Sequence, residues 1–358
     1  SRPEAPVPGP LPLAAGPSAP AAPPTPAPPP PAPAAPTAAE ALAARFAHLR
    51  PPGDRRYFDA LLAHLAGIAD HPFAPVYVEY AATAVARGRA AGAALAPHVR
   101  LAGARVLDIG CAYGGFVVAL AEAGALPLGI DVNDHLLALS RHLAADHGVP
   151  IEALRHDATV DRGDFHGAFD LIVANDVIEH VEALDAFLAN LARWLAPGGL
   201  VYLEIPNGRF PGFVRRDGHH GAFAVSLLEF DTAAALLRET GLATSYDTYN
   251  YLTLEEYRSR FADHGLSLEL LDGAMADLSR ESVLGEVEGL RAEWRERLEL
   301  EVPEPYRPQV TAALESYLAE IDGSGAADPG HEEELFTRYG ASFWRVLCRR
   351  SGPAPPPA

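Results

Sequence analysis

Lysine is absent from the 358-residue chain, and every basic side chain other than histidine is arginine. Mechanisms that need a lysine base or a lysine Schiff base are therefore excluded. Cysteine is scarce as well. Cys111 and Cys348 alone cannot build a disulfide framework, so we expect a reducing, cytoplasmic location. The abundance of alanine, proline and arginine is typical of a GC-rich bacterial genome.

The chain also lacks long apolar runs, clustered positive charge and a visible secretory signal. No run approaches the roughly 20 apolar residues that span a bilayer, so we expect no membrane insertion. The net charge of −19 disfavours nucleic acid or an anionic membrane surface as the main partner. Hydrophobic residues make up 49% of the chain, which is enough for a sizeable core.

Composition and periodicity divide the chain into parts. Residues 1–36 hold 16 of the 34 prolines and almost no charge, a composition that cannot bury a core. Apolar residues recur at helical spacing in Tyr57–Ile68 and Val76–Ala96. In chain order we predict a disordered tail (1–40), N-terminal helices (41–100), an α/β domain (101–274 and 341–351), a helical insertion (275–340) and a second Pro-rich disordered tail (352–358).

From Arg105 onward, β-rich runs alternate with amphipathic helices, which is typical of a parallel sheet with crossover helices. We predict irregular structure for residues 206–252. A capping box from Thr253 to Glu256 then predicts the start of a further helix. The predicted strands are Arg105–Ile109, Pro127–Ile130, Ile151–Arg155, Phe169–Ala174, Leu200–Ile205, Leu266–Asp272 and Ser342–Arg349.

The segment 275–340 reads as two amphipathic helices. Its 16 carboxylates against 6 arginines leave a net charge of −10, which disfavours a polyanionic ligand. Both helices must bury an apolar face, either as a lid over a ligand or as a homodimer surface. The residues predicted to face inward are Val283, Val287, Leu290, Trp294 and Leu298 in one helix, and Val310, Leu314, Tyr317, Leu318 and Ile321 in the other.

The segment Val106–Gly115, VLDIGCAYGG, joins the first predicted strand to a helix. Glycines in such a turn let the backbone approach a ligand closely. Gly110, Ala112 and Gly115 also fit a dinucleotide fingerprint whose middle glycine is replaced by alanine. Asp108 favours a different ligand. A buried carboxylate needs a partner such as an ammonium group, which a nicotinamide dinucleotide does not offer at that point.

Two further acids end the next two strands. Asp131 is placed to accept both hydroxyls of a ribose. Asp157 is placed to accept a hydrogen bond from an adenine amino group, and Ala158 to supply a backbone N–H. Each acid alone fits a solvated loop carboxylate or a helix cap. Three acids in register fall along one edge of the sheet, where open α/β folds bind ligands.

A resemblance to a known family rests on five segments in order: VLDIGCAYGG, GID, HDA, FDLIVANDVIEHV and LAPGG. Together they resemble class I S-adenosylmethionine-dependent methyltransferases, most closely the small-molecule branch of ubiquinone and menaquinone biosynthesis. The resemblance covers about Arg105–Asp272, with Ser342–Arg349 as the expected seventh strand. It implies a Rossmann-like α/β fold, a sheet of order 3-2-1-4-5-7-6 with an antiparallel last strand, and S-adenosylmethionine as cofactor.

The resemblance also implies roles for individual residues. Ala112 lies in the cofactor-binding turn where the family usually has glycine, and a methyl group there should alter the loop only slightly. The other residues implied are Asp108, Gly110 and Gly114 at the methionine end, Asp131 at the ribose, Asp157 and Ala158 at the adenine, and Asn175 near the sulfonium.

An oxygen acceptor needs a general base beside the sulfonium, and histidine suits neutral pH. His180, just past the fourth strand, is one candidate, and it also fits a packing residue or a helix N-terminus. His219 or His220, over the same edge of the sheet, is another, with a loop histidine of no specific role as the alternative. Three tyrosines either line an aromatic acceptor pocket or pack along an edge: Tyr246, Tyr249 and Tyr251.

We expect no metal site. Asn175 and Asp176 resemble part of a carboxylate site, but no third oxygen ligand stands at a matching place and Asp176 fits a helix cap. His219 and His220 would point in opposite directions in an extended segment, which is a poor arrangement for zinc.

The sequence therefore predicts an enzyme that methylates a small molecule, such as a natural product, a quinone or lipid precursor, or a sugar. One alternative is a catalytically silent scaffold with the same fold, against which the three retained acids count. The other is an NAD-dependent oxidoreductase, against which Asp108 and the EHV and LAPGG segments count. The sequence does not specify the acceptor or the atom that is methylated.

Overall fold

The computed structural model describes residues 36–50, 55–71, 74–243, 245–271, 279–325 and 330–351. All of them except Pro36 belong to one compact unit, Thr37–Ala358. Most of the predicted tail 1–40 and all of the tail 352–358 lie outside the described residues. Within residues 36–40, helix α1 (Ala38–Arg45) begins with a capping box between Thr37 and Glu40.

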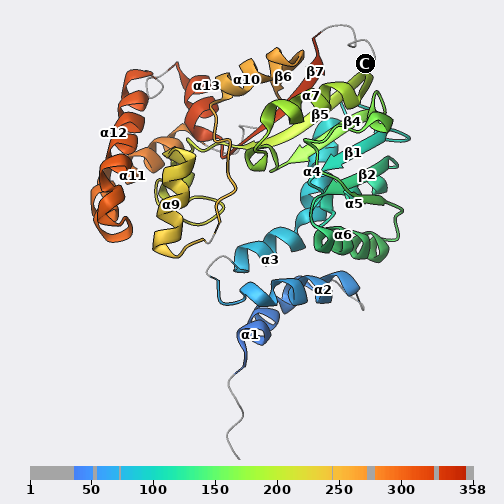
Figure 1. Cartoon of the computed structure of the whole chain (residues 1–358), viewed down its shortest axis with the longest axis horizontal. Helices are drawn as coiled ribbons and strands as arrows, with labels where there is room; N and C mark the ends of the chain where they lie inside the picture. Colours follow the sequence, from blue (N-terminus) through green and yellow to red (C-terminus); the bar gives the residue numbers. More distant parts are fainter. Residues whose placement is uncertain are drawn as a thin grey trace, which may run out of the picture. The chain divides into compact units, whose positions relative to one another are not determined.

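A seven-stranded sheet organises the unit, in the order β3-β2-β1-β4-β5-β7-β6 (Figure 1). Strands β1 to β5 pair in parallel, and β7 is antiparallel to both β5 and β6. The Rossmann-like order predicted from the sequence is thereby confirmed. The strands are β1 (Arg105–Ile109), β2 (Leu126–Asp131), β3 (Glu152–Arg155), β4 (Phe169–Asn175), β5 (Leu195–Pro206), β6 (Leu266–Leu270) and β7 (Phe343–Arg350).

Helices cover both faces of the sheet, so its central strands are apolar on both sides. Leu107 and Ile109 of β1 share a buried cluster with helices α7 (Leu184–Trp194) and α10 (Leu254–Asp263). Val106 faces the opposite way, into a cluster that includes α4 (Ala84–Leu95) and α5 (Gly115–Glu122). The capping box predicted at Thr253 is present at the start of α10. The remaining elements flanking the sheet are α6 (Asp134–His147), η3 (Gly163–Phe165) and η4 (Ile178–His180).

The N-terminal helices pack against α5 and α6. The predicted stretch Val76–Ala96 forms two helices that are broken at Thr83, whose hydroxyl donates to the Glu79 carbonyl at 2.8 Å. The elements are η1 (Ala47–Leu49), α2 (Arg56–Leu65), η2 (Ala66–Ile68), α3 (Ala74–Ala82) and α4 (Ala84–Leu95). Helices α4 and α5 approach closely, because a Cβ atom at Gly88 would lie only 2.7 Å from the Gly115 carbonyl oxygen.

We expect Gly88→Ala to destabilise the protein and Gly285→Ala to stabilise it. Both replace a glycine inside a helix, which by itself gains roughly 0.5–1 kcal/mol. At Gly88 the new methyl group would clash with the carbonyl of Gly115, and such overpacking costs about 1–3 kcal/mol. At Gly285 an added Cβ atom would meet open space, because no described atom outside the helix's own backbone lies within 4 Å of it. Denaturant unfolding measures both changes, and equal shifts in the two variants would contradict the close α4–α5 contact.

The segment after β5, predicted as irregular over 206–252, contains α8 (Pro211–Arg215), η5 (Val225–Leu227) and α9 (Phe230–Thr240). The irregular prediction was wrong for α9, which ends at the left-handed Gly241 (φ +70°). Buried residues of α9 have helical spacing that was overlooked: Ala233, Leu236 and Leu237.

The acidic segment forms α11 (Arg280–Glu301), η6 (Glu304–Tyr306), α12 (Arg307–Gly323), α13 (Glu332–Leu335) and the π-helical turn η7 (Phe336–Gly340). The residues predicted to face inward are buried or partly buried in one cluster, which α9 also joins (Figure 1). Arg215 of α8 pairs with Glu286 and Glu293 of α11, each at 2.7 Å. In the described part of the chain, no helix is long and apolar enough to cross a membrane.

Candidate active site

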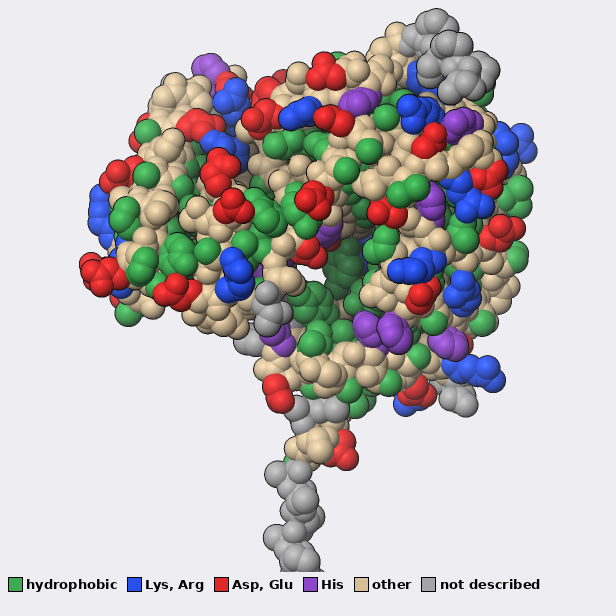
Figure 2. Space-filling view, in the orientation of Figure 1, with side chains coloured by type: hydrophobic (Ala, Val, Ile, Leu, Met, Phe, Trp, Pro, Cys, Tyr) green, Lys and Arg blue, Asp and Glu red, His purple; other side chains and the backbone are tan. Residues whose placement is uncertain are grey.

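A cavity with a volume of about 680 Å³ lies at the carboxyl ends of β1, β2, β3 and β4. This volume is within the range of small-molecule sites, roughly 300–1,000 Å³. The face shown in Figure 2 is hollowed near its centre, where hydrophobic, acidic and histidine side chains gather. Among the described residues that line the cavity, none comes from α11, α12 or α13.

The turn after β1 forms one wall of the cavity. Its backbone is left-handed at Gly110 (φ +63°), Ala112 (φ +42°) and Gly114 (φ +85°). A Cβ atom at Gly110 would lie 2.6 Å from Val177, and one at Gly114 would lie 2.6 Å from Ser140. Glycine is therefore required at both positions, whereas Ala112 tolerates a conformation that is uncommon for a residue with a side chain.

Asp108 lies beneath this turn, one residue before β1 ends. It is buried, and its Oδ2 accepts no hydrogen bond from any described residue. Burial, together with the nearby charge of Asp131, raises the pKa of Asp108 to about 8. A buried carboxylate of this kind is costly without a cationic partner, so its position indicates a ligand with a positive charge.

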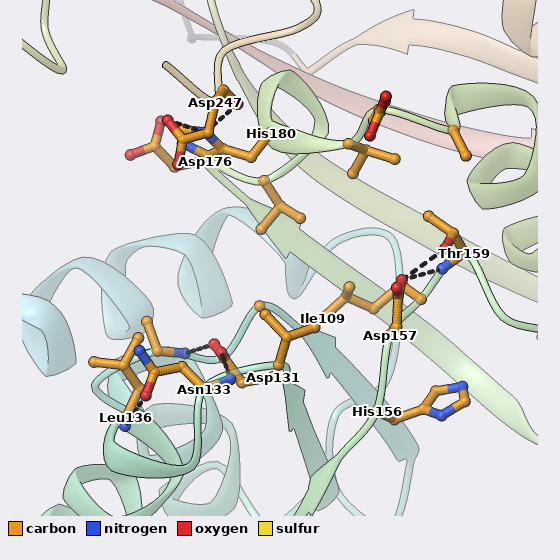
Figure 3. Close-up of a pocket in the computed structure, with 18 of the residues that line it drawn as sticks. Ile109, Asp131, Asn133, Leu136, His156, Asp157, Thr159, Asp176, His180 and Asp247 are labelled. Atoms are coloured by element: carbon orange, nitrogen blue, oxygen red, sulfur yellow. Dashed lines mark hydrogen bonds and ion pairs between the residues drawn. The ribbon is translucent and has the colours of Figure 1, made fainter. Parts of the chain in front are cut away.

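Asp131 ends β2 and fixes the turn. Its Oδ2 accepts a hydrogen bond from the Ala112 N–H at 3.0 Å, and its Oδ1 accepts one from the Asn133 N–H at 2.8 Å. Burial raises the pKa of Asp131, while these backbone N–H groups oppose the shift. Each oxygen keeps a second lone pair, and Asp131 lines the cavity (Figure 3). The carboxylate is thus prepared to accept two hydroxyl groups.

Asp157 and Ala158 follow β3 and line the cavity as well. Asp157 Oδ1 accepts from the N–H of Thr159 at 2.8 Å and from its hydroxyl at 2.7 Å, which holds the loop in a tight turn. Asn190 of α7 donates to the Ala158 carbonyl at 2.9 Å. Figure 3 shows Asp157 directed into the cavity from a different strand than Asp131.

The opposite wall comes from the turn after β4. Asp176 has a left-handed backbone (φ +58°), and Tyr80 of α3 donates to its Oδ2 at 3.3 Å. Burial and the neighbouring Glu179 raise the pKa of Asp176 to about 7. The 3₁₀ helix η4 begins after Val177 without a side-chain cap. The prediction that Asp176 caps a helix was therefore wrong, because the chain turns sharply at this residue.

His180 lines the cavity on this wall. Its Nδ1 lies 3.1 Å from the Asp247 carbonyl oxygen, and its Nε2 lies 3.7 Å from Glu179 Oε1. Asp176, His180 and Asp247 lie together in Figure 3, across the cavity from Asp131. Burial lowers the pKa of His180, but the carboxylates of Asp247 and Glu179 more than offset this and raise it overall.

His219 and Tyr251 form a buried network around Asp217. The Tyr251 hydroxyl donates to Asp217 Oδ1 at 2.9 Å and lies 2.8 Å from His219 Nδ1. Burial lowers the pKa of His219, but Asp217 and Glu179 outweigh it and raise that pKa to about 10. His219 Nε2 lies 3.6 Å from Glu179 Oε1, and the His180 and His219 rings meet edge to face.

A family model described as "Methyltransferase domain" matches residues 77–271, more than half of the chain. The chain belongs to the class I S-adenosylmethionine-dependent methyltransferases. This methyltransferase has the strand order and the cavity position that the family resemblance implied. S-adenosylmethionine is the cofactor of the family, and the site fits it. The uncompensated Asp108 oxygen suits an ammonium group, and Gly110 leaves room that a Cβ atom would fill.

Curated relatives are ubiquinone biosynthesis O-methyltransferases. The enzyme of Sinorhizobium fredii is 34% identical over 109 residues, which cover 30% of this chain and 43% of that protein. The enzyme of Methylococcus capsulatus is 28% identical over 176 residues, which cover 49% of this chain and 68% of that protein. The chain spans about half the length of several of these curated relatives.

A solved S-adenosylmethionine-dependent methyltransferase from Mesorhizobium loti is 19% identical, with a TM-score of 0.43. The match covers 73% of this chain and 98% of that chain.

The structure brings some of the predicted site residues to the cavity and places others behind it. Asn175 lies at the end of β4, where its side-chain amide donates to the Tyr80 hydroxyl at 3.4 Å. The predicted residues that line the cavity are Gly110, Ala112, Asp131, Asp157, Ala158 and His180. The predicted residues that are not among the lining are Asp108, Gly114, Asn175, His219 and His220.

His220 is turned away from the cavity. Its Nδ1 lies 3.3 Å from Asp217 Oδ2, and its ring packs against Tyr246. His219 and His220 were expected to point in opposite directions in an extended segment, but residues 217–220 form a turn, and both Nδ1 atoms face Asp217. Of the three tyrosines, Tyr249 lines the cavity and stacks on Phe230.

Sequence reasoning missed three residues of the second wall. Glu179 precedes the histidine of the EHV segment, and its spacing from Asp176 places both acids on one tight turn. Asp217 stands before Gly-His-His, a typical turn sequence. Both patterns, the spacing of the two acids and the turn sequence, are visible in the amino-acid sequence. Tyr80 sits inside a helix with no distinguishing pattern, and only the packing of α3 brings it to Asp176.

Proposed function

We propose that this methyltransferase transfers the methyl group of S-adenosylmethionine to an oxygen atom of a small molecule. The observation that carries the proposal is that one cavity joins the two walls: Asp131 and Asp157 line it on the cofactor side, and His180 and Tyr249 on the other. A shared cavity allows the donor methyl group and an acceptor to be aligned for in-line transfer. The curated relatives are O-methyltransferases, which supports oxygen as the acceptor atom.

On the cofactor side we assign roles by position. Asp108 would balance the charge of the ammonium group. The backbone at Gly110, Ala112 and Gly114 would hold the methionine end, and Asn175 would lie near the sulfonium. Asp131 would accept the ribose hydroxyls, and Asp157 with the Ala158 N–H would hold the adenine. These assignments are supported by the unpaired Asp108 oxygen and by the lone pairs that Asp131 directs at the cavity.

On the acceptor side, His180 is the candidate that reaches the cavity directly. His219 is buried behind it and His220 is turned toward Asp217, so we assign neither a direct contact with the acceptor. The sulfonium supplies the reactive methyl group, which leaves the chain to exclude water and to favour loss of the acceptor proton. The aromatic face of Tyr249 favours an acceptor with a flat apolar part.

The function is tested by incubating the full chain with methyl-labelled S-adenosylmethionine and a panel of small phenols, quinols and sugars. We expect S-adenosylhomocysteine and a labelled methyl ether with at least one hydroxyl acceptor. The same acceptor with its hydroxyl already methylated serves as the matched control and should give no product. Tight cofactor binding without turnover on any member would instead favour the catalytically silent scaffold.

A cytoplasmic location and a homodimer through the insertion remain predictions. Cys111 and Cys348 are both buried free thiols, which suits a reducing compartment. The apolar faces of α11 and α12 pack within the chain, so a homodimer would use the outer, charged surface of these helices. Light scattering at several concentrations measures the oligomeric state.

A further inference from the structure

The second wall contains a cluster of groups that bind metals. The ligand atoms of Glu179, His180 and His219 all lie within 4.8 Å of one another. Asp176 stands beside Glu179, and its Oδ1 is buried without a hydrogen bond from any described residue. Glu179 is fully buried, and neither of its carboxylate oxygens accepts a hydrogen bond from a described residue. Burying two such carboxylates together is costly unless a cation compensates them. In the metal-free chain the protonated His219 does so, and a metal ion would displace that proton.

The distances within the cluster suit a shared cation better than direct hydrogen bonds. Glu179 Oε1 lies 3.6 Å from His219 Nε2 and 3.7 Å from His180 Nε2. These separations are too long for hydrogen bonds. Two ligands that are each about 2.0–2.2 Å from one ion, at tetrahedral or octahedral angles, are separated by roughly 2.8–3.6 Å. The ligand atoms of the cluster lie within 4.8 Å of one another, so an inward movement of the side chains would complete such a site.

The outer contacts of both histidines orient them as metal ligands. His180 Nδ1 lies 3.1 Å from the Asp247 carbonyl oxygen, which only accepts, so Nδ1 carries a proton. In the neutral ring Nε2, on the side of Glu179, would then offer a lone pair to a metal ion. His219 Nδ1 contacts the Tyr251 hydroxyl, which itself donates to Asp217. Ligating histidines usually donate their second N–H to a carbonyl, a carboxylate or another oxygen in this way.

We propose that Glu179, His180 and His219, with Asp176 beside them, bind one divalent transition-metal ion at the wall of the cavity. Two imidazoles and a carboxylate favour manganese, iron, cobalt or zinc over magnesium or calcium. The site replaces our expectation of no metal, which rested on the absence of a third oxygen ligand. Glu179 is that ligand.

The ion's role in catalysis rests on the proposed function. His180 lines the cavity, so an ion on its Nε2 would lie within reach of an acceptor hydroxyl. In this arrangement His180 would hold the ion instead of acting as the base itself, and a hydroxyl bound to the ion would be more acidic and would lose its proton to water in the open cavity. The acceptor oxygen then forms the O–CH₃ bond while the S–CH₃ bond breaks. The bonding electrons stay on sulfur, which leaves S-adenosylhomocysteine.

Metal binding is tested on the full chain after treatment with a chelator, by titration with Co²⁺ alone. We expect one Co²⁺ per chain, with visible absorption bands that report nitrogen and oxygen ligands. Glu179→Gln and His219→Gln should each weaken binding at least 100-fold. His220→Gln is the matched control, because it alters the neighbouring histidine of the same turn, and it should keep the wild-type affinity within about threefold.

His180→Gln is the second variant, because its side chain is one-third exposed and its loss should not prevent folding. The proposal is overturned if the wild-type chain binds no Co²⁺, or if binding is unchanged in both His180→Gln and His219→Gln. Turnover that is equally fast with and without bound metal would overturn the catalytic role and leave methyl transfer intact. Calorimetry with S-adenosylmethionine, in the absence of metal, tests the cofactor site separately.

Discussion

Asp131→Ala should weaken S-adenosylmethionine binding at least 100-fold. The Asp131 carboxylate lines the cavity and has a free lone pair on each oxygen for the ribose hydroxyls. Hydrogen bonds to a charged group contribute roughly 1.5–3 kcal/mol each, and two of them at the lower bound give about 3 kcal/mol. At 1.4 kcal/mol per tenfold change, this is somewhat more than two orders of magnitude in Kd, which isothermal calorimetry resolves.

The matched control is Asp134→Ala, three residues further along. Its side chain is 74% exposed and is not among the cavity lining, so we expect cofactor affinity within about twofold of wild type. Asp131→Ala also removes the acceptor for the Ala112 and Asn133 N–H groups, so its melting temperature must be measured alongside. A folded Asp131→Ala protein that binds the cofactor as tightly as the control variant would refute the assignment.

Cofactor affinity should rise steeply with pH between about 6 and 8. The pKa of Asp108 in the free protein is about 8, because the group is buried and lies near the charge of Asp131. The cofactor's ammonium group favours the ionised carboxylate, so binding below pH 8 must release a proton. Affinity therefore increases by up to tenfold per pH unit and levels off above pH 8. Calorimetry in buffers with different ionisation enthalpies measures the released proton.

Asp108→Asn should remove this pH dependence and leave affinity at pH 8 weaker by at least tenfold. Asp134→Asn, an exposed acid outside the cavity lining, should keep the wild-type profile. A wild-type affinity that stays constant from pH 6 to 8 would show that Asp108 does not face the ammonium group.

The same raised pKa links Asp108 to stability of the free protein. The folded chain retains the Asp108 proton up to about pH 8, whereas the unfolded chain loses it near the ordinary aspartate pKa of 3.8. The stability contributed by protonated Asp108 is therefore fully present below about pH 4 and is lost as pH rises through 8. Asp108→Asn should accordingly gain stability relative to wild type at pH 8, and less so at pH 5.

The sheet and its cofactor edge were predictable because they depend on local patterns. Strands β1, β2 and β4 are short, mainly apolar runs bounded by turn residues. An acid within two residues of the end of each of the first three strands falls at one edge by topology alone. Helix α9 was missed because it is short and is flanked on both sides by irregular segments, which hid the helical spacing of its apolar residues.

The second wall was not predictable to the same degree. Glu179 and His180 are adjacent in sequence, but His219 reaches them only through the turn around Asp217 and its hydrogen bond with Tyr251. The side chains that complete this wall are dozens of residues apart along the chain. Their meeting depends on how the segment after β5 packs, which no local pattern specifies.

The contact between α8 and α11, made by Arg215 with Glu286 and Glu293, joins the insertion to the segment that carries Asp217 and His219. The insertion therefore supports the segment behind the second wall of the cavity, while the first wall is built at the ends of β1, β2 and β3. We therefore expect substitutions in the insertion to change acceptor preference while the residues of the first wall continue to hold the cofactor.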